Sequence, residues 1–350
     1  MSPCFHPRLV NGPFGDPALF VPFFYEKRAF MFDLGDISSL SARDILKLTH
    51  IFVSHTHVDH FIGFDYVLRI LLGRDKSLYL FGPPGFLRNV EGKLSGYAWN
   101  LVENYSSNFS LHVTEIHHDR MVQKVYSCRN RFEALSAPHE VLFDGNILTE
   151  PAFSVNAVHL DHKICSLGFS LKESFHVNIL KDRLSALALP VGPWLKRFKE
   201  ALYDGKDKDS FFEVSWKESG LEHKREFKLG ELEKKIARIT PGQKIAYITD
   251  IRYTPENIEK VIGLARGANV LFIEACFIDA DSKRAYEKYH LTARQAGILA
   301  RKSGAGQIRL FHFSPRYTHN PETLYREAES AFSNKDCNSG YMTGALIFLM

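Results

Sequence analysis

Apolar positions in the first third of the chain form short runs rich in aromatic and β-branched residues, which is typical of buried β-strands. We predict strands at residues 18–27, 28–34, 50–54 and 77–82. Between some of these runs the apolar residues recur at helical spacing, which predicts helices at 41–48 and 59–73. Strands that alternate with helices in this way indicate an α/β fold.

The last third of the chain repeats this alternation. We predict strands at residues 153–160, 165–171, 244–249, 269–275, 307–313 and 344–350. We predict helices at residues 254–266, 291–303 and 321–332. Thr254-Pro255 and Asn320-Pro321 mark the starts of two of these helices, because proline is tolerated in the first turn. Residues 97–150 show no clear period, and we predict no elements there.

Residues 176–230 differ from both flanking regions, because they are rich in charge and poorly periodic. We interpret them as an insertion between two β-rich halves. The organisation predicted from the sequence is therefore a single domain, 1–350, with an inserted arm at about 176–230.

Composition adds limits to this picture. The chain of 350 residues is 45% hydrophobic and 24% charged, which is an ordinary globular composition, and its net charge of +4 permits an anionic partner without implying one. The five cysteines form no CxxC pair and are odd in number, so we expect a reducing compartment. The N-terminus lacks a signal-peptide h-region and no apolar run is long enough to span a bilayer, so we expect a cytoplasmic protein without a membrane partner.

The segment "HTHVDH" follows an apolar run and holds His55, His57, Asp59 and His60. On an extended segment, residues two apart point to the same side, so His55 and His57 can reach one metal ion. A helix that starts near Asp59 would turn this carboxylate and His60 toward a second ion. Imidazole nitrogen with carboxylate oxygen is a ligand set that zinc accepts. The alternative is a polar turn with solvated histidines.

A site with two ions needs further ligands, and candidates follow other predicted strands. His159 and His162 end one strand, Asp250 ends another, and His312 ends a third. A carboxylate such as Asp250 can bridge two ions. A single histidine at a strand end is usually a core or surface residue, but α/β folds place their chemistry at strand ends, so the group together indicates a metal site.

"HTHVDH", with "FMFDLGD" upstream, resembles the metallo-β-lactamase superfamily, and the order of later motifs resembles the ribonuclease Z family of tRNA 3′-processing endonucleases. The matching segments are "YITDIRYTPEN", "FIEACF", "HLT" and "HFSPRY", and His162 precedes Gly168-Phe169 at the family's spacing of six residues. "LPVGPWLKRF" resembles the Gly-Pro-containing arm that grips tRNA. The resemblance implies an α/β fold, a metallo-β-lactamase αββα sandwich with an inserted flexible arm.

The resemblance also implies the ligands of two Zn²⁺ ions per chain. One ion would be held by His55, His57, His162 and Asp250, and the other by Asp59, His60, Asp250 and His312. Asp33 would orient a ligand rather than bind metal, although it could equally be a turn residue before Gly35. His139 in "SAPHEV" is a rival for the third histidine of the first group, without the following Gly-Phe strand.

Catalytic roles come from the same resemblance. Asp59 would hold or deprotonate the attacking water, and His290, oriented by Glu274, would protonate the leaving ribose 3′-oxygen. Four residues would contact the substrate: Trp194, Lys196, Arg197 and Arg316. The implied partner is RNA, most specifically precursor tRNA, and the family implies a homodimer.

Several positions depart from the family pattern, and they bear on the substrate. "HPRLVNGPFGDP" does not match the usual Leu-Gly-Thr loop, Ile248-Thr249-Asp250 replaces Ser-Gly-Asp, Ile273 replaces a histidine and Phe311 a threonine. A hydrolase of a small phosphodiester, sulfate ester or thioester is therefore the alternative, although such an enzyme needs no protruding arm. A catalytically inert RNA-binding relative is a second alternative, and the filled metal positions speak against it.

Overall fold

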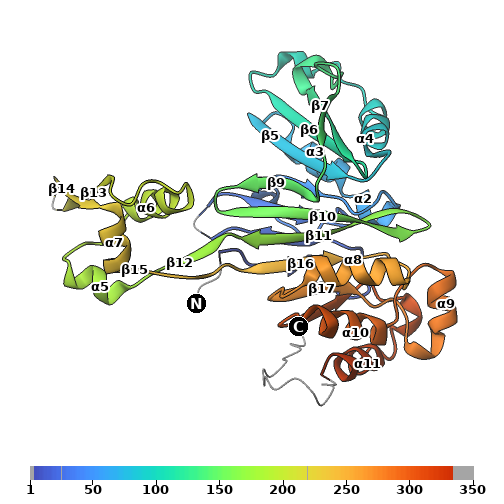
Figure 1. Cartoon of the computed structure of the whole chain (residues 1–350). Coiled ribbons are helices and arrows are strands. Elements are labelled where there is room, and N and C mark those ends of the chain that lie inside the picture. The colour runs from blue at the N-terminus through green and yellow to red at the C-terminus, as the bar shows by residue number, and fades with distance from the viewer. Residues whose placement is uncertain (1–3, 25, 219, 334–350) are drawn as a thin grey trace. The chain divides into compact units, whose positions relative to one another are not determined.

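The computed structural model describes residues 4–24, 26–218 and 220–333 (Figure 1). The chain divides into two compact units. The larger unit comprises the described parts of Phe5–Ile147, Asn156–Ser170 and Ile245–Met350, and the smaller unit those of Met1–Cys4, Leu148–Val155 and Leu171–Lys244. The predicted arm, 176–230, falls within the smaller unit.

The first sheet of the larger unit has eight strands in sequence order, and its middle strands β3 to β6 run parallel. The strands are β1 (Arg8–Leu9), β2 (Leu19–Pro22), β3 (Ala29–Phe32), β4 (Leu48–Phe52), β5 (Lys76–Gly82), β6 (Phe109–Ile116), β7 (Arg120–Ser127) and β8 (His139–Leu142). Apolar side chains on one face of this sheet pack under α1 (Ala42–Ile45), α2 (Val58–Phe61), α3 (Phe64–Leu71) and α4 (Phe86–Ser95).

The second sheet has six strands in the order β18-β17-β16-β11-β10-β9. Their bounds are β9 (Asn146–Glu150), β10 (Phe153–His162), β11 (Ile164–Glu173), β16 (Lys244–Ile248), β17 (Val270–Glu274) and β18 (Ile308–Phe311). The parallel strands β16, β17 and β18 carry α8 (Pro255–Ala265), α10 (Ala293–Ser303) and α11 (Glu322–Ser333) on their outer side (Figure 1). The short α9 (Ser282–Glu287) precedes α10.

Aromatic side chains join the inner faces of the two sheets. Phe32 and Phe52 of the first sheet lie with ring centroids 5.7 Å and 5.8 Å from Phe169 of the second. The centroid of Phe32 is also 5.8 Å from that of Tyr247. Apolar clusters under the helices cover the outer faces. The predicted αββα sandwich is therefore confirmed.

The smaller unit has a core of its own. β12 (Phe175–Ile179) and β15 (Ala237–Pro241) pair antiparallel, as do β13 (Phe211–Glu218) and β14 (Leu221–Lys228). Three helices accompany them: α5 (Lys181–Ala186), α6 (Trp194–Tyr203) and α7 (Leu229–Ile236). Trp194, Phe198 and Ala201 lie on one face of α6, at spacings of four and three residues, and are buried in this core.

Two regions differ from the predicted elements. Residues 97–150 contain β6 to β9, where no elements were predicted. β6 does alternate, with Phe109, Leu111 and Val113 buried, whereas Gln123 interrupts the alternation of β7. The predicted helix at 59–73 is divided into α2 and α3 around Gly63, where the chain approaches so closely that a Cβ would lie 2.4 Å from the carbonyl oxygen of Gly35.

One predicted strand, 344–350, lies outside the described residues. Within the described ranges, every helix is too short or too polar to span a lipid bilayer.

Candidate metal centre

The centre is built at the carboxyl ends of strands in both sheets of the larger unit. The loop after β4 carries His55 and His57 and leads into α2, which carries Asp59 and His60. Three further side chains come from the second sheet: His162 at the end of β10, Asp250 after β16 and His312 after β18. The strand ends therefore bring together residues that are up to 257 positions apart in the sequence.

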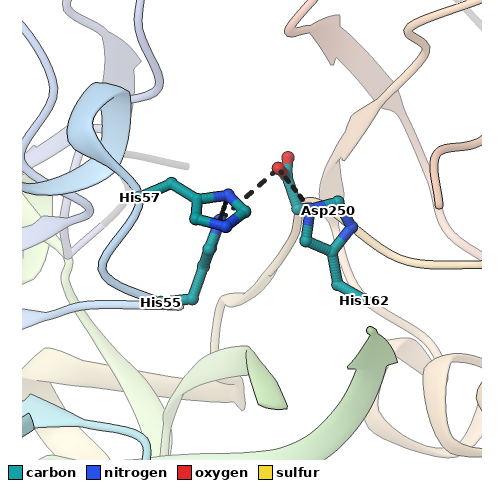
Figure 2. Close-up of side chains that lie close together, drawn as sticks. All are labelled: His55, His57, His162 and Asp250. Atoms are coloured by element: carbon teal, nitrogen blue, oxygen red, sulfur yellow. Dashed lines mark hydrogen bonds and ion pairs between the residues drawn. The ribbon is translucent and has the colours of Figure 1, made fainter. Parts of the chain in front are cut away.

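The first group of possible metal ligands is His55, His57, His162 and Asp250, whose nitrogen and oxygen atoms lie within 4.8 Å of one another. Figure 2 shows the two histidines of the β4 loop facing Asp250 and His162. Oδ2 of Asp250 is 3.6 Å from Nε2 of His55 and 3.3 Å from Nε2 of His162. Nitrogens and carboxylate oxygens that converge in this way fit a cation between them.

The second group is Asp59, His60 and His312. Oδ2 of Asp59 is 3.6 Å from Nε2 of His60 and 3.4 Å from Nε2 of His312. Asp250 connects the two groups, because its Oδ2 is also 3.5 Å from Nε2 of His60. The structure thus gathers all seven predicted ligands into two adjoining groups that share this carboxylate.

His60 supplies a direct test of whether the residues fit a metal ion. Its imidazole is fully buried, and its Nδ1 lies 2.9 Å from Oδ2 of Asp33. Its Nε2, in contrast, has no hydrogen-bond partner. A buried polar atom without a partner is costly, and here it faces the carboxylates of Asp59 and Asp250. The donor set and this unpaired nitrogen both fit a bound cation.

Asp33 fixes the orientation of this ligand without joining either group. It accepts hydrogen bonds from the backbone N–H and the hydroxyl of Ser54, at 2.6 Å and 2.8 Å, and from the hydroxyl of Tyr247 at 2.8 Å. Its backbone has a φ of 57°, a conformation that is strained for a residue other than glycine. The sequence offered no signal for Ser54 or Tyr247, because ordinary strand residues become partners of Asp33 only when the sheets meet.

Electrostatics separate the ligands by protonation state. Burial, reinforced by the charge of His60, lowers the pKa of His55 to about 2, and burial also lowers the pKa of His57. Both imidazoles are therefore neutral at pH 7, the form that binds metal. Burial opposes charge on His60, but Asp250 and Asp33 outweigh it and raise its pKa to about 10. The carboxylates that attract a proton to His60 would also attract a metal cation.

The carboxylates of the centre are ionised. Burial alone would raise the pKa of Asp59, but the hydrogen bond from His312 and the charge of His60 lower it to about 2. The pKa of the buried Asp250 is held well below its usual range, because the charges of His312 and His60 outweigh the effect of burial. Both side chains therefore offer negative oxygens to a cation at neutral pH.

Glu274 and His290 form a pair beside the two groups. Oε2 of Glu274 is 2.8 Å from Nδ1 of His290, and its Oε1 accepts a hydrogen bond from the backbone N–H of Ile251 at 2.8 Å. Glu274 is fully buried, whereas His290 keeps 17% of its side chain exposed. Burial opposes charge on His290, but Glu274 raises its pKa. Asp250, Glu274, His290 and His312 also lie close enough together to form a third group of possible ligands.

Other sequence candidates lie elsewhere. His159, a candidate beside His162, directs its Nε2 to the carbonyl oxygen of Ile116 at 3.0 Å, and His139, the rival of His162, is exposed on β8. Neither belongs to a group of possible ligands among the described residues. Arg316 lies exposed in a short 3₁₀ helix (Pro315–Tyr317).

The predicted contacts of the arm need a correction. Lys196 and Arg197 are exposed on α6. Trp194, however, is 0% exposed, and its indole N–H donates to the carbonyl oxygen of Pro190 at 2.9 Å. The expectation that Trp194 contacts substrate is therefore wrong, because its ring fills the core of the smaller unit.

Comparisons with known proteins agree with the fold. The family described as "Beta-lactamase superfamily domain" matches residues 235–313. A ribonuclease Z from Deinococcus radiodurans is 27% identical, with 85% of each chain covered, and one from Pediococcus pentosaceus is 30% identical, with 82% of this chain and 78% of the relative covered.

Among solved structures, a metallo-beta-lactamase fold protein from Bacillus subtilis has a TM-score of 0.53 at 14% identity, with 93% of this chain and 92% of that chain covered. The short form of human tRNase Z has a TM-score of 0.50 at 18% identity, with 89% and 91% covered. These two likenesses concern the fold, and the sequence relatives extend them to the family. The chain therefore belongs to the ribonuclease Z family, and it is a hydrolase of the metallo-β-lactamase superfamily.

Proposed function

We propose that this chain is a zinc-dependent endoribonuclease that removes 3′ extensions from precursor tRNA. The observation that carries the proposal is the pair of ligand groups joined by Asp250, with the Glu274–His290 pair 2.8 Å apart at their border. Curated relatives named ribonuclease Z support the substrate class. We assign one zinc to His55, His57, His162 and Asp250, and the other to Asp59, His60, Asp250 and His312.

Zinc bound in these groups would supply a water of lowered pKa and positive charge beside the attacked phosphate. Asp59 is ionised and half-exposed, so it can hold the water and accept its proton. His290 reaches the solvent-facing side of the centre while Glu274 holds its Nδ1, so its Nε2 can donate a proton to the leaving 3′-oxygen. The carboxylate of Glu274 raises the pKa of His290, which favours the protonated form that a proton donor needs.

RNA contacts are assigned to exposed cations. We propose Lys196 and Arg197 in the smaller unit and Arg316 after β18 as phosphate contacts, because their side chains are solvent-exposed. Such contacts contribute affinity rather than sequence specificity.

The test compares two substrates on one preparation. Purified protein loaded with zinc is incubated with a 3′-extended tRNA precursor and, separately, with bis(p-nitrophenyl) phosphate, and its metal content is measured by elemental analysis. We expect two zinc ions per chain and preferential cleavage of the precursor at its 3′ side. A zinc content well below one per chain would contradict the metal assignment. Cleavage of the small diester alone would favour a small-ester hydrolase.

His139→Ala is the matched control for the ligand histidines. His139 is exposed on β8 and lies outside the ligand groups. Its removal should leave zinc content and precursor cleavage unchanged, whereas His162→Ala should lower both.

A further inference from the structure

Two strained residues flank the metal centre without a part in the mechanism above. Lys163 has a φ of 65° and Tyr289 a φ of 64°, and each lies next to a residue of the centre, His162 or His290. A positive φ is unusual for residues with a large side chain, and it persists where surrounding structure enforces it, often at functional sites.

Arg252 stacks on the ring of Tyr289. The guanidinium carbon lies 3.8 Å from the ring centroid of Tyr289 and 4.8 Å from that of Tyr286. Nζ of Lys163 lies 6.0 Å from the Tyr289 centroid, so two cations lie against one aromatic ring. The carbonyl oxygen of Tyr289 also lies 2.8 Å from Nδ1 of the ligand His162, which joins this cationic cluster directly to the centre.

A buried amide holds the cluster in place. Asn257 of α8 is 2% exposed, and its Nδ2 donates to the carbonyl oxygens of Asp161 and Arg252, at 3.0 Å and 2.8 Å. Its Oδ1 accepts from the backbone N–H of Asp161 at 3.0 Å. The loop after β10, which carries Lys163, is thus fixed beside the loop after β16, which carries Arg252.

The two cations keep donors available for an anion. Among the described residues Arg252 has one loose ion pair, in which Nη1 lies 3.8 Å from Oδ2 of Asp161. Its Nε is buried, so the terminal amines of its partly exposed guanidinium are the donors that can meet an anion. The Lys163 side chain is exposed, and its ammonium forms no ion pair within the part of the chain that the structure describes. A guanidinium stacked on an aromatic ring leaves its in-plane N–H groups free, which suits bidentate binding of a phosphate.

We infer that Arg252 and Lys163, held on Tyr289, bind a phosphate of the RNA strand immediately beside the metal centre. This inference rests on the proposed function and adds an anchor for RNA in the larger unit, independent of the arm. The cluster is joined to His162 through a single carbonyl group, so a phosphate bound there lies next to the reacting groups.

The test measures binding rather than turnover. A fluorescently labelled 3′-extended tRNA is titrated with metal-free protein at several salt concentrations, with fluorescence anisotropy as the readout. The variants are Arg252→Gln, Arg252→Lys and Lys163→Asn, because asparagine tolerates the positive φ of position 163. Lys302→Ala removes an exposed cation of α10 far along the helix from the centre and serves as the control.

We expect Arg252→Gln and Lys163→Asn each to raise the Kd about tenfold at low salt. Each should also reduce the slope of log K against log salt by about 0.7–0.9, the value of one lost phosphate contact. Arg252→Lys should recover the slope but only part of the affinity, because it restores the charge without the planar donors. Lys302→Ala should match the wild type in both readouts.

Wild-type affinity and salt slope in Arg252→Gln and Lys163→Asn would overturn the inference and show that the stack only packs the loop. Thermal unfolding is followed in parallel, and if Arg252→Gln is destabilised, the exposed Lys163→Asn decides the question alone. A wild-type protein that does not bind the precursor and, when loaded with zinc, does not cleave it would overturn the proposed function itself, and the two failures are thereby distinguished.

Discussion

The larger and the smaller unit differ in how many ionisable side chains they bury. In the larger unit His55, His60, Asp250 and Glu274 are at most 2% exposed, and they face one another. In the smaller unit the core cluster is apolar, Glu173 and His176 are buried as a pair 2.9 Å apart, and cations such as Lys196, with 62% of its side chain exposed, lie at the surface. Buried charge is costly unless it is paired or binds metal, whereas exposed charge costs little. In the larger unit the buried ionisable side chains therefore indicate where the chemistry takes place. The role of the exposed cations in the smaller unit can be established only by measuring binding.

The largest expected effect comes from Asp59→Ala, which removes a proposed ligand and the acceptor of the water's proton. We expect kcat on precursor tRNA to fall about 10³-fold or more, because a general base alone contributes about 10²–10⁴-fold. Asp59 is partly exposed, so the fold should be retained, and circular dichroism checks this. Retained activity in a correctly folded variant would contradict the role of Asp59.

His290→Ala tests the division between ligands and the proton donor. We expect kcat to fall about 10²-fold with zinc content unchanged, because the Glu274–His290 pair supplies the proton rather than the metal site. Single-turnover kinetics and elemental analysis are run on the same preparation. Loss of zinc would instead assign His290 to the third group of possible ligands, with Asp250, Glu274 and His312.

Removal of the arm tests the smaller unit as a whole. Ile179 pairs with Ala237 in the β12–β15 ladder, and the N–H of Leu180 donates to the carbonyl oxygen of Ile236 at 2.9 Å. Residues 181–235 can therefore be replaced by Asn-Gly, a pair suited to a two-residue hairpin turn. We expect cleavage of precursor tRNA to fall about 10- to 100-fold, because a second binding surface is lost.

Bis(p-nitrophenyl) phosphate is the comparison substrate for this deletion, since all proposed metal ligands lie outside the deleted residues. Its hydrolysis should stay near the wild-type rate. If the deletion changed both rates by the same factor relative to the wild type, the arm would not hold RNA, and a small-ester hydrolase would be favoured.

The smallest effects on cleavage are expected from substitutions of Trp194 and Lys196, one buried and one exposed residue of α6. Trp194→Ala opens a cavity in the small core and should lower the free energy of unfolding of the smaller unit by about 3–5 kcal/mol. Hydrogen exchange of α6 amides measures this loss. Lys196→Ala should leave that exchange unchanged and weaken RNA binding in a salt-dependent way. The opposite pattern would reverse the roles assigned to the buried and the exposed side chain.

The elements with strong apolar periods were predictable from the sequence. Five predicted elements appear in the structure, because the apolar period is strong in each and the helices also have capping residues at their starts. They are the strands around 28–34, 50–54 and 244–249, which are β3, β4 and β16, and the helices around 254–266 and 291–303, which are α8 and α10. β7 was not predictable, since it has partly exposed residues on both faces and its sequence does not alternate. β6 does alternate over Phe109–Val113, so its period by itself indicates a strand. Gly63, where the predicted helix divides, depends on the approach of Gly35, which no local pattern reveals.

The sequence by itself determined which residues had the chemistry for a metal centre and that they followed apolar strands. The density of imidazoles in "HTHVDH" indicated a ligand loop before any contact was known. Only the tertiary structure decided that Asp250 joins the two ligand groups, that Nε2 of His60 is left without a partner, and that Arg252 stacks on Tyr289. It also decided that Trp194 lies in a core and not at a surface. The physical reason is that burial and pairing depend on segments far apart in the chain, whereas local sequence encodes period and residue chemistry alone.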